Sequence, residues 1–146
     1  MNVASDNAYL AFVDDGRVLD AQPYYLGIPQ GLAGGSALVA LRDDLRKILT
    51  TYEIQRLRVL DPESNYSGPY VSLAARYTLE TIIIIAGAEQ GIDAARISRA
   101  SVRSILGMPR QGSLQSHVSG LIEAVGPHWS RKRDCAALAA LAGWRS

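Results

Sequence analysis

The chain has 146 residues, 48% of them hydrophobic, which is the usual size of one domain and enough to bury a good core. Its formal net charge of +1 excludes a whole-molecule field that attracts nucleic acid, so any nucleic-acid site must be a local patch. The single cysteine, Cys135, excludes an internal disulfide and a cysteine-rich zinc site. We therefore expect one domain over residues 1–146 in a reducing cytoplasm. The longest apolar run, residues 81–88, is too short to span a membrane.

The first 27 residues predict a meander of three antiparallel strands. Residues 2–5 and 8–13 are apolar runs, and Asp6-Asn7 between them is typical of a turn. Asp15-Gly16 is a strong hairpin signal, and the strand pattern resumes over residues 17–26. A glycine-rich loop over residues 27–35 follows.

The middle of the chain alternates helix and strand. Ser36 can cap an amphipathic helix whose apolar residues recur at helical spacing as far as Leu49. Residues 56–61 predict a buried strand that Pro62 ends, because proline cannot continue a central strand. A helix over residues 70–90 is apolar nearly all round in its second half, which indicates burial on more than one side.

The C-terminal third predicts one more strand and three helices. The strand covers residues 94–98, and the helices cover residues 99–106, residues 113–125 and a stretch from about Arg131 to Gly143. The element order β-β-β-α-β-α-β-α-α-α predicts an α/β fold. Its mixed five-stranded sheet would join the meander to the last two strands and carry helices on both faces.

Three aspartates are expected at one edge of this sheet. Asp61 ends the strand over residues 56–61, Asp6 follows the first strand, and Asp134 lies in the first turn of the last helix. In such sheets, chemistry collects outside the carboxyl ends of the strands. Each aspartate alone is better explained by a turn or by the helix dipole, so the hypothesis depends on their joint placement.

Three stretches together resemble one known family. Residues 3–13, VASDNAYLAFV, are similar to its opening of strand, aspartate and strand, and RVLDPE is similar to its fourth strand with an acidic end. Residues 91–106 and 131–144 resemble its strand with a short basic helix and its last helix, which begins with an aspartate. The family is that of the RuvC-type Holliday junction resolvases, on the RNase H-like fold. The resemblance covers nearly the whole chain in element order.

This resemblance implies a metal-dependent, structure-selective endonuclease that resolves branched DNA by two-metal phosphodiester hydrolysis. Asp6, Asp61 and Asp134 would be the catalytic metal ligands, and Glu63 competes with Asp61 for the middle position. Two Mg²⁺ or Mn²⁺ ions would occupy the site, since hard ions prefer oxygen ligands. Arg131 stands where the family usually has a second acid or histidine.

The resemblance also implies a DNA partner and a homodimer formed through the helix over residues 70–90. Arginine suits bidentate phosphate contacts, and 13 of the 15 basic residues are arginine. The residues expected on a phosphate-binding surface are Arg99, Arg103, Arg110, Arg131 and Lys132. Tyr66 and Tyr70 flank the loop where an aromatic of the family can stack on an opened base. The alternative for both is a surface tyrosine that packs on the helix start.

Two other functions stay open. A catalytically inactive RNase H-like module that binds DNA or a protein is favoured by Arg131 and by the near-neutral charge. An acidic-loop domain of the sugar-kinase and actin type opens with a similar strand-acid-strand pattern. It needs a glycine-rich phosphate loop, for which Gly34-Gly35 is a poor match. A nicking assay on a synthetic junction separates these functions.

Overall fold

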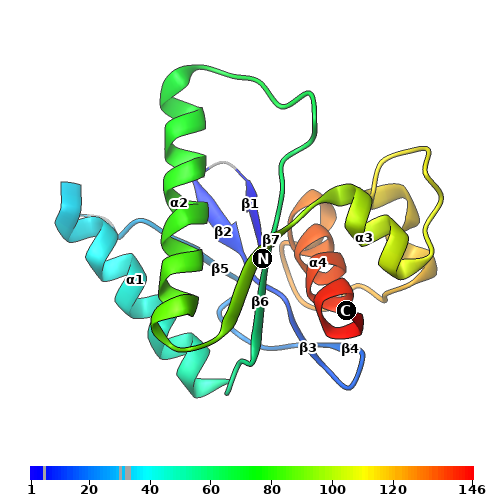
Figure 1. Cartoon of the computed structure of the whole chain (residues 1–146), viewed down its shortest axis with the longest axis horizontal. Coiled ribbons are helices and arrows are strands. Elements are labelled where there is room, and N and C mark those ends of the chain that lie inside the picture. The colour runs from blue at the N-terminus through cyan, green and yellow to red at the C-terminus, as the bar shows by residue number, and fades with distance from the viewer. Residues whose placement is uncertain (5, 30, 32–33) are drawn as a thin grey trace.

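The structure is a computed structural model that describes residues 1–4, 6–29, 31 and 34–146 (Figure 1). Within these ranges short strands and helices form a mixed α/β fold. The strands are β1 Asn2–Ala4, β2 Asn7–Tyr9, β3 Phe12–Asp14, β4 Arg17–Leu19, β5 Tyr25–Gly27, β6 Arg56–Leu60 and β7 Asp93–Ile97. The α-helices are α1 Gly34–Thr51, α2 Tyr70–Glu89, α3 Arg99–Leu106 and α4 Asp134–Arg145.

The described strands form three small sheets, where we expected one sheet of five strands. One is antiparallel with the order β1-β2-β5, one is the hairpin β3-β4 at Asp15-Gly16, and one is the parallel pair β6-β7. The expected strand over residues 17–26 is therefore two strands, β4 and β5, in different sheets. Pro23 lies between them and cannot donate to a ladder, which explains why the strand does not continue.

Hydrogen bonds of the first residue attach β1 to β6 in a parallel arrangement. The amino group of Met1 donates to the carbonyl of Arg58 (2.6 Å), and the N–H of Leu60 donates to the carbonyl of Met1 (3.0 Å). This pattern places Met1 level with Val59. The three-stranded sheet and the β6-β7 pair therefore meet edge to edge, and both end near the start of α4.

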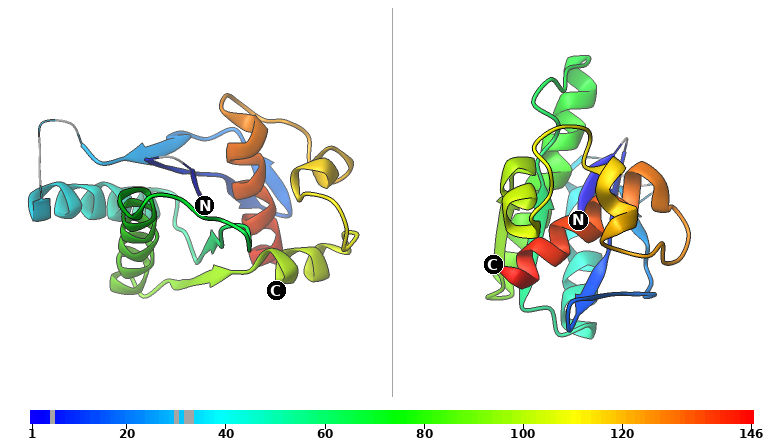
Figure 2. Two further views of the ribbon diagram at one scale, coloured as in Figure 1. Left: turned by 90° about the horizontal axis from the view of Figure 1, so that it is seen from above. Right: turned by 90° about the vertical axis from the view of Figure 1, so that its right-hand side faces the viewer.

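Two hydrophobic clusters lie on opposite faces of β6. Leu57 and Val59 belong to the cluster that packs on α1 and α2, whereas Leu60 belongs to the cluster that packs on α3 and α4. Side chains of a strand alternate between its faces, so this arrangement follows from the sequence of β6. In Figure 1 and in the left view of Figure 2, α1 and α2 lie on one side of the molecule and α3 and α4 on the other.

Helix α2 covers almost the whole predicted range and packs closely on the strands. A Cβ built on Gly87 would lie 2.6 Å from the Cβ of Ala94 in β7 and 3.0 Å from a methyl carbon of Leu57, so a glycine is required there. By length and composition alone α2 is able to cross a membrane, but 33% of that stretch is buried inside the molecule. One face of α2 packs against α1 and β7, and the opposite face is exposed.

The C-terminal region differs from the prediction in two places. The expected helix over residues 113–125 is only a 3₁₀ helix, Gln115–Gly120, because Gly120 ends it and the chain then loops as far as Trp129. The last helix starts at Asp134, three residues later than expected. Ser130 and Arg131 have non-helical backbones in the irregular turn Trp129–Arg133, and Arg131 is left-handed with φ 58°.

Candidate nucleic-acid interface

Asp61 lies directly after β6 and faces an arginine. Its N–H donates to the carbonyl of Ile97, so the parallel ladder continues one residue beyond the strand. Its side chain lies on the α2 side, where a carboxylate oxygen is 3.7 Å from the guanidinium of Arg96. The position predicted at the carboxyl end of β6 is confirmed, and its carboxylate already has a cationic partner.

Arg96 joins Asp61 to a buried carboxylate in α2. The Glu80 side chain is fully buried, and both of its oxygens accept hydrogen bonds from arginines, one from Arg96 and one from Arg76 at 2.8 Å. The Arg76 guanidinium lies 4.9 Å from the ring centre of Tyr66. A buried charge needs such partners, and together they fix α2, β7 and the loop after β6 relative to one another.

The sequence analysis missed this network. Arg76 and Glu80 are four residues apart, the spacing of a helical ion pair, inside a helix that is otherwise apolar. A charged pair on the buried face of such a helix is the signal that could have identified it. The partner on β7, Arg96, gives no comparable signal in the sequence.

Asp134 uses both carboxylate oxygens to hold backbone N–H groups. One oxygen accepts from Cys135 (2.6 Å) and the other from Arg131 (2.8 Å). The carboxylate is buried at the first turn of α4, where the helix dipole favours a negative charge. Burial raises the pKa of the neighbouring Cys135 thiol to about 12, and the charge of Asp134 acts in the same direction.

Asp6 is exposed in the turn between β1 and β2. With Met1 level with Val59, the residue of β1 that is level with Asp61 is Val3. Asp6 therefore lies in the turn beyond the end of β1, three residues after the residue that is level with Asp61.

Among the described residues, no three His, Cys, Asp or Glu side chains form a group that could hold a metal ion. Asp61 faces Arg96, Asp134 binds backbone N–H groups, and Glu63 lies 3.6 Å from the guanidinium of Arg99. The side chains present therefore do not fit the two-ion centre that the resemblance implies. The ligand roles of Asp6, Asp61, Asp134 and Glu63 stay a prediction.

Arg99 connects the loop after β6 to the start of α4. Its Nε donates to the carbonyl of Asp61 (3.1 Å), and its charge lowers the pKa of Cys135, against the larger effect of burial. Its Nη1 is buried without a hydrogen bond. Arg99 begins α3, whose N-terminus is capped by the hydroxyl of Ser98, which accepts from the N–H of Ser101 (3.0 Å).

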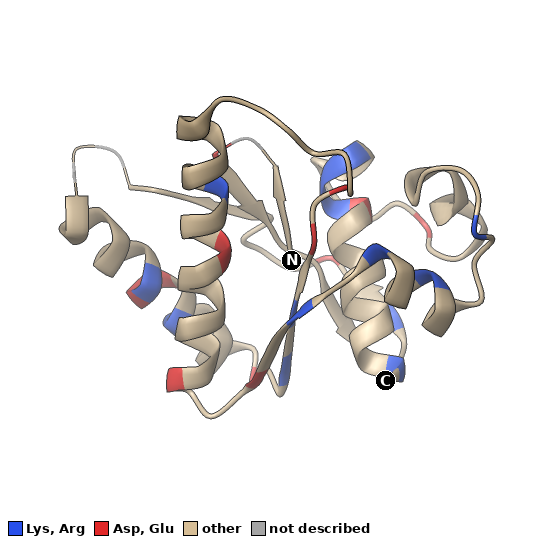
Figure 3. Cartoon of the chain, turned by 45° about the horizontal axis from the view of Figure 1, so that its top comes forward, with Lys and Arg blue, Asp and Glu red and all other residues tan. Residues whose placement is uncertain are grey.

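The other predicted basic residues have different environments. Arg103 donates to the carbonyls of Pro109 and Gly112, so it holds the loop after α3 in shape. None of the ion pairs among the described residues involves Arg110, Arg131 or Lys132. Figure 3 shows Lys and Arg along β7 and α3 and at the start of α4, interleaved with acidic positions.

The buried side chain of Arg133 is a second feature that the sequence analysis missed. In the sequence Arg-Lys-Arg reads as a surface run, but the Arg133 side chain is fully buried. Its Nε donates to the carbonyl of Leu10 (2.9 Å) and its Nη1 to that of Pro127 (3.0 Å), and its guanidinium lies over the ring of Tyr24 (4.5 Å). Burial lowers the pKa of Arg133. This side chain anchors the turn that carries Arg131 and Lys132.

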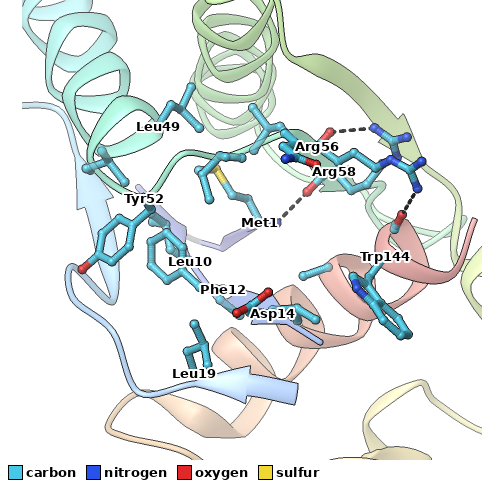
Figure 4. A pocket seen from close by; sticks show the side chains of 18 of the residues that line it. Met1, Leu10, Phe12, Asp14, Leu19, Leu49, Tyr52, Arg56, Arg58 and Trp144 are labelled. Carbon is cyan, nitrogen blue, oxygen red and sulfur yellow. Dashed lines mark hydrogen bonds between the residues drawn. The ribbon is translucent and has the colours of Figure 1, made fainter. Parts of the chain in front are cut away.

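A cavity of about 640 Å³ lies at the opposite end of β6, between α1, β3 and the end of α4 (Figure 4). Apolar side chains line much of it, with Tyr52 and Trp144 at its sides. The two arginines at its wall are engaged, since Arg58 pairs with Asp93 (2.6 Å) and Arg56 donates to the carbonyl of Gly143 (3.0 Å). The cavity is separate from the carboxyl edge of β6.

The sequence matches no protein-family model and no curated protein. The fold matches solved structures over most of the chain. A structure of T. thermophilus RuvC in complex with Holliday junction substrate has a TM-score of 0.62 at 13% identity, covering 88% of this chain and 78% of that chain. A Thermus thermophilus RuvC structure has a TM-score of 0.65 at 10% identity, covering 88% and 77%.

This chain has the RuvC fold. The predicted resemblance is therefore confirmed at the level of the fold, and the low identity fits a divergent chain. Within the RuvC fold, RVLDPE is β6 with its acidic end, and RDCAALAALAG supplies α4. The basic helix α3 has the bounds that the sequence predicted.

Proposed function

We propose that this chain recognises branched DNA with the surface around the start of α4. The observation that carries this proposal is that basic side chains border the carboxyl edge of β6 in the RuvC fold (Figure 3), where the described residues form no group that could hold a metal ion. A solved structure with this fold contains a Holliday junction. Recognition of branched DNA is therefore better supported than its cleavage.

The cations with no ion pair are the best candidates for phosphate contacts. Arg131 and Lys132 lie on one turn, and Arg110 lies on the loop after α3. Phosphate contacts of this kind position DNA without reading its sequence, and they weaken as salt rises because counterions are released. Arg96 pairs with the carboxylate of Asp61 and Arg99 donates to its backbone carbonyl, so each would contact a phosphate by exchanging that partner.

Two copies of the chain would pair through α2. Its outward face exposes a row of large apolar side chains: Tyr70 (82% exposed), Val71 (76%), Tyr77 and Ile85. Large contiguous apolar patches on a protein surface mark interaction sites. A dimer would present two DNA surfaces to the arms of one junction. Light scattering at micromolar concentration tests this, and the mass of a monomer would refute it.

Cleavage of the bound junction is the second function. One observation favours it: Arg99 donates to the backbone carbonyl of Asp61, and its charge acts on the thiol of Cys135, the residue after Asp134, so the segments that carry the two aspartates both lie near one arginine. A phosphate that attracted Arg96 would release Asp61. The Mg²⁺ or Mn²⁺ dependence that the resemblance implies belongs to this second function.

The test compares a four-way junction with a duplex of the same strands. Fluorescence anisotropy in EDTA measures binding, and gel electrophoresis with Mg²⁺ or Mn²⁺ measures cutting. We expect tighter binding of the junction in EDTA. The two lysines of the chain give a matched pair of variants, since Lys132→Gln should weaken binding and Lys47→Gln, on the exposed face of α1, should not. Equal affinity for junction and duplex would refute recognition, and symmetric cuts would establish the endonuclease.

A further inference from the structure

An aromatic cluster lies beside Lys132, which makes no ion pair with the described residues, at the turn that also carries Arg131. It is made by Tyr9 of β2, Tyr25 of β5 and His128 of the loop before α4. The ring centres of Tyr25 and His128 are 5.2 Å apart at an interplanar angle of 82°, and Tyr9 lies 6.0 Å from Tyr25. Tyr9 is buried, whereas Tyr25 is 46% exposed and His128 is also exposed. The cluster is therefore a supported platform with an open side.

The cations are part of this platform. The ammonium of Lys132 lies 5.3 Å from the centre of the Tyr9 ring, a cation–π distance, and the carbonyl of Lys132 accepts from the side chain of Asn2 (3.1 Å). Two carboxylates close in sequence to parts of this cluster are engaged. Asp134 accepts from two backbone N–H groups, and Asp20 accepts from the Tyr24 hydroxyl (2.9 Å).

The backbone of this turn is strained and firmly held. His128 and Arg131 both have left-handed backbones, with φ of 55° and 58°, which side chains other than glycine rarely adopt. The carbonyl of His128 accepts from the N–H of Arg133 (3.1 Å), and the Arg133 side chain is buried. Such strain persists only where the surrounding structure imposes it, and it concentrates at ligand-binding positions.

We propose that the exposed Tyr25 ring stacks on one unpaired nucleobase and that the His128 ring, which stands edge-on to Tyr25, contacts the edge of that base, while Arg131 and Lys132 bind its phosphate. This inference rests on the proposed recognition of branched DNA and specifies which nucleotide is bound, a base that leaves the helical stack at the branch point. Every base has a π-face, so stacking needs no particular sequence. The site is separate from Tyr66 and Tyr70, which lie before and at the start of α2, and the Tyr66 ring is already covered by Arg76.

The experiment uses two DNA probes that contain the fluorescent base 2-aminopurine. One is a four-way junction with this base at the branch point, and the other is a single strand. The fluorescence of 2-aminopurine falls when the base stacks on an aromatic ring. Wild-type protein should quench both probes. Tyr25→Leu should lose the quenching and bind the junction roughly 5- to 150-fold more weakly, the effect of one lost base stack. Its salt dependence should stay unchanged because no charge is lost.

Three further variants keep the test decisive. His128→Asn retains a residue that tolerates a left-handed backbone but removes the ring, so it should also lose quenching. Tyr25→Phe should bind as the wild type, which separates ring stacking from the fold. The control is Trp144→Leu, which removes an aromatic of similar exposure (48%) at the other end of α4 and should change nothing.

Each outcome has one meaning. If the wild type prefers the junction and both Tyr25→Leu and His128→Asn quench and bind as it does, the stacking site is refuted and recognition stands. If the wild type binds junction and duplex equally, the proposed function itself fails. Should Tyr25→Leu not fold, His128→Asn alone decides, because its substitution lies on the surface.

Discussion

Removal of the Glu80 carboxylate tests the buried network most directly. Glu80→Leu would leave Arg76, which is also buried, with a charge that only the ring of Tyr66 still faces. Breaking a buried ion pair from one side typically costs about 3–5 kcal/mol, because the remaining charge stays desolvated. Arg96 is about one third exposed and keeps Asp61 as a partner, so its share of the loss is small. We therefore expect a loss of about 3 kcal/mol from Arg76 alone.

The double variant Glu80→Leu/Arg76→Leu provides the internal control. It removes both buried charges and fills the space with apolar atoms, so it should regain most of the lost stability. Urea denaturation followed by circular dichroism measures the free energy of unfolding of wild type, both single variants and the double variant. The reasoning is refuted if Glu80→Leu costs less than about 1 kcal/mol, or if the two substitutions add without coupling.

Three other predictions concern separate parts of the chain. Arg131→Asp should keep the fold, since aspartate tolerates the left-handed backbone there, and should weaken junction binding; calorimetric binding of Mn²⁺ by the variant but not the wild type would instead favour the endonuclease. Gly87→Ala should destabilise by about 1–3 kcal/mol, because its methyl group overlaps Ala94, whereas Gly35→Ala, in open space, should not; equal denaturation midpoints would contradict this. Because burial raises the pKa of Cys135 from 9.0 to about 12, only the unfolded thiol ionises between these values. Stability should therefore fall as pH rises through this range by up to about 1.4 kcal/mol per pH unit, and Cys135→Ala should reduce the slope.

The sequence predicted those elements whose ends carry local signals. Helix α3 has its predicted bounds because Ser98 caps it and Gly107 ends it with a left-handed backbone. Helix α2 differs from its prediction by one residue at its C-terminus. The predicted three-stranded meander is wrong because the second predicted strand divides its partners. Its first part pairs with β5, as far as the hydrogen bond from Leu10 to the carbonyl of Tyr24, and its second part, β3, pairs with β4. A change of sheet partner of this kind depends on tertiary packing and leaves no mark in the apolar pattern.

The sequence predicted where Asp61 and Asp134 lie in their own elements, but not which groups their carboxylates contact. Asp61 and Asp134 lie at the ends of the expected elements. The partner of Asp61, however, depends on the register of the β6-β7 pair. This register places Arg96, from a segment far along the chain, opposite Val59 and within reach of the Asp61 carboxylate. The cap made by Asp134 depends on the left-handed backbone of Arg131. The charged residues are visible in the sequence, whereas their pairing follows from the register of β6 and β7 and from the backbone of the turn before α4.

The hydrogen bonds of the Arg133 side chain also determine when, during folding, the turn Trp129–Arg133 can form. Its hydrogen bond to Leu10 joins residues 123 positions apart, so loop closure must bring together early and late parts of the chain. During synthesis the β2 end of this contact emerges first and the Arg133 end almost last. A nascent or partly folded chain therefore cannot present His128, Arg131 and Lys132 in their native geometry, and the surface that we propose for DNA forms only when folding is nearly complete.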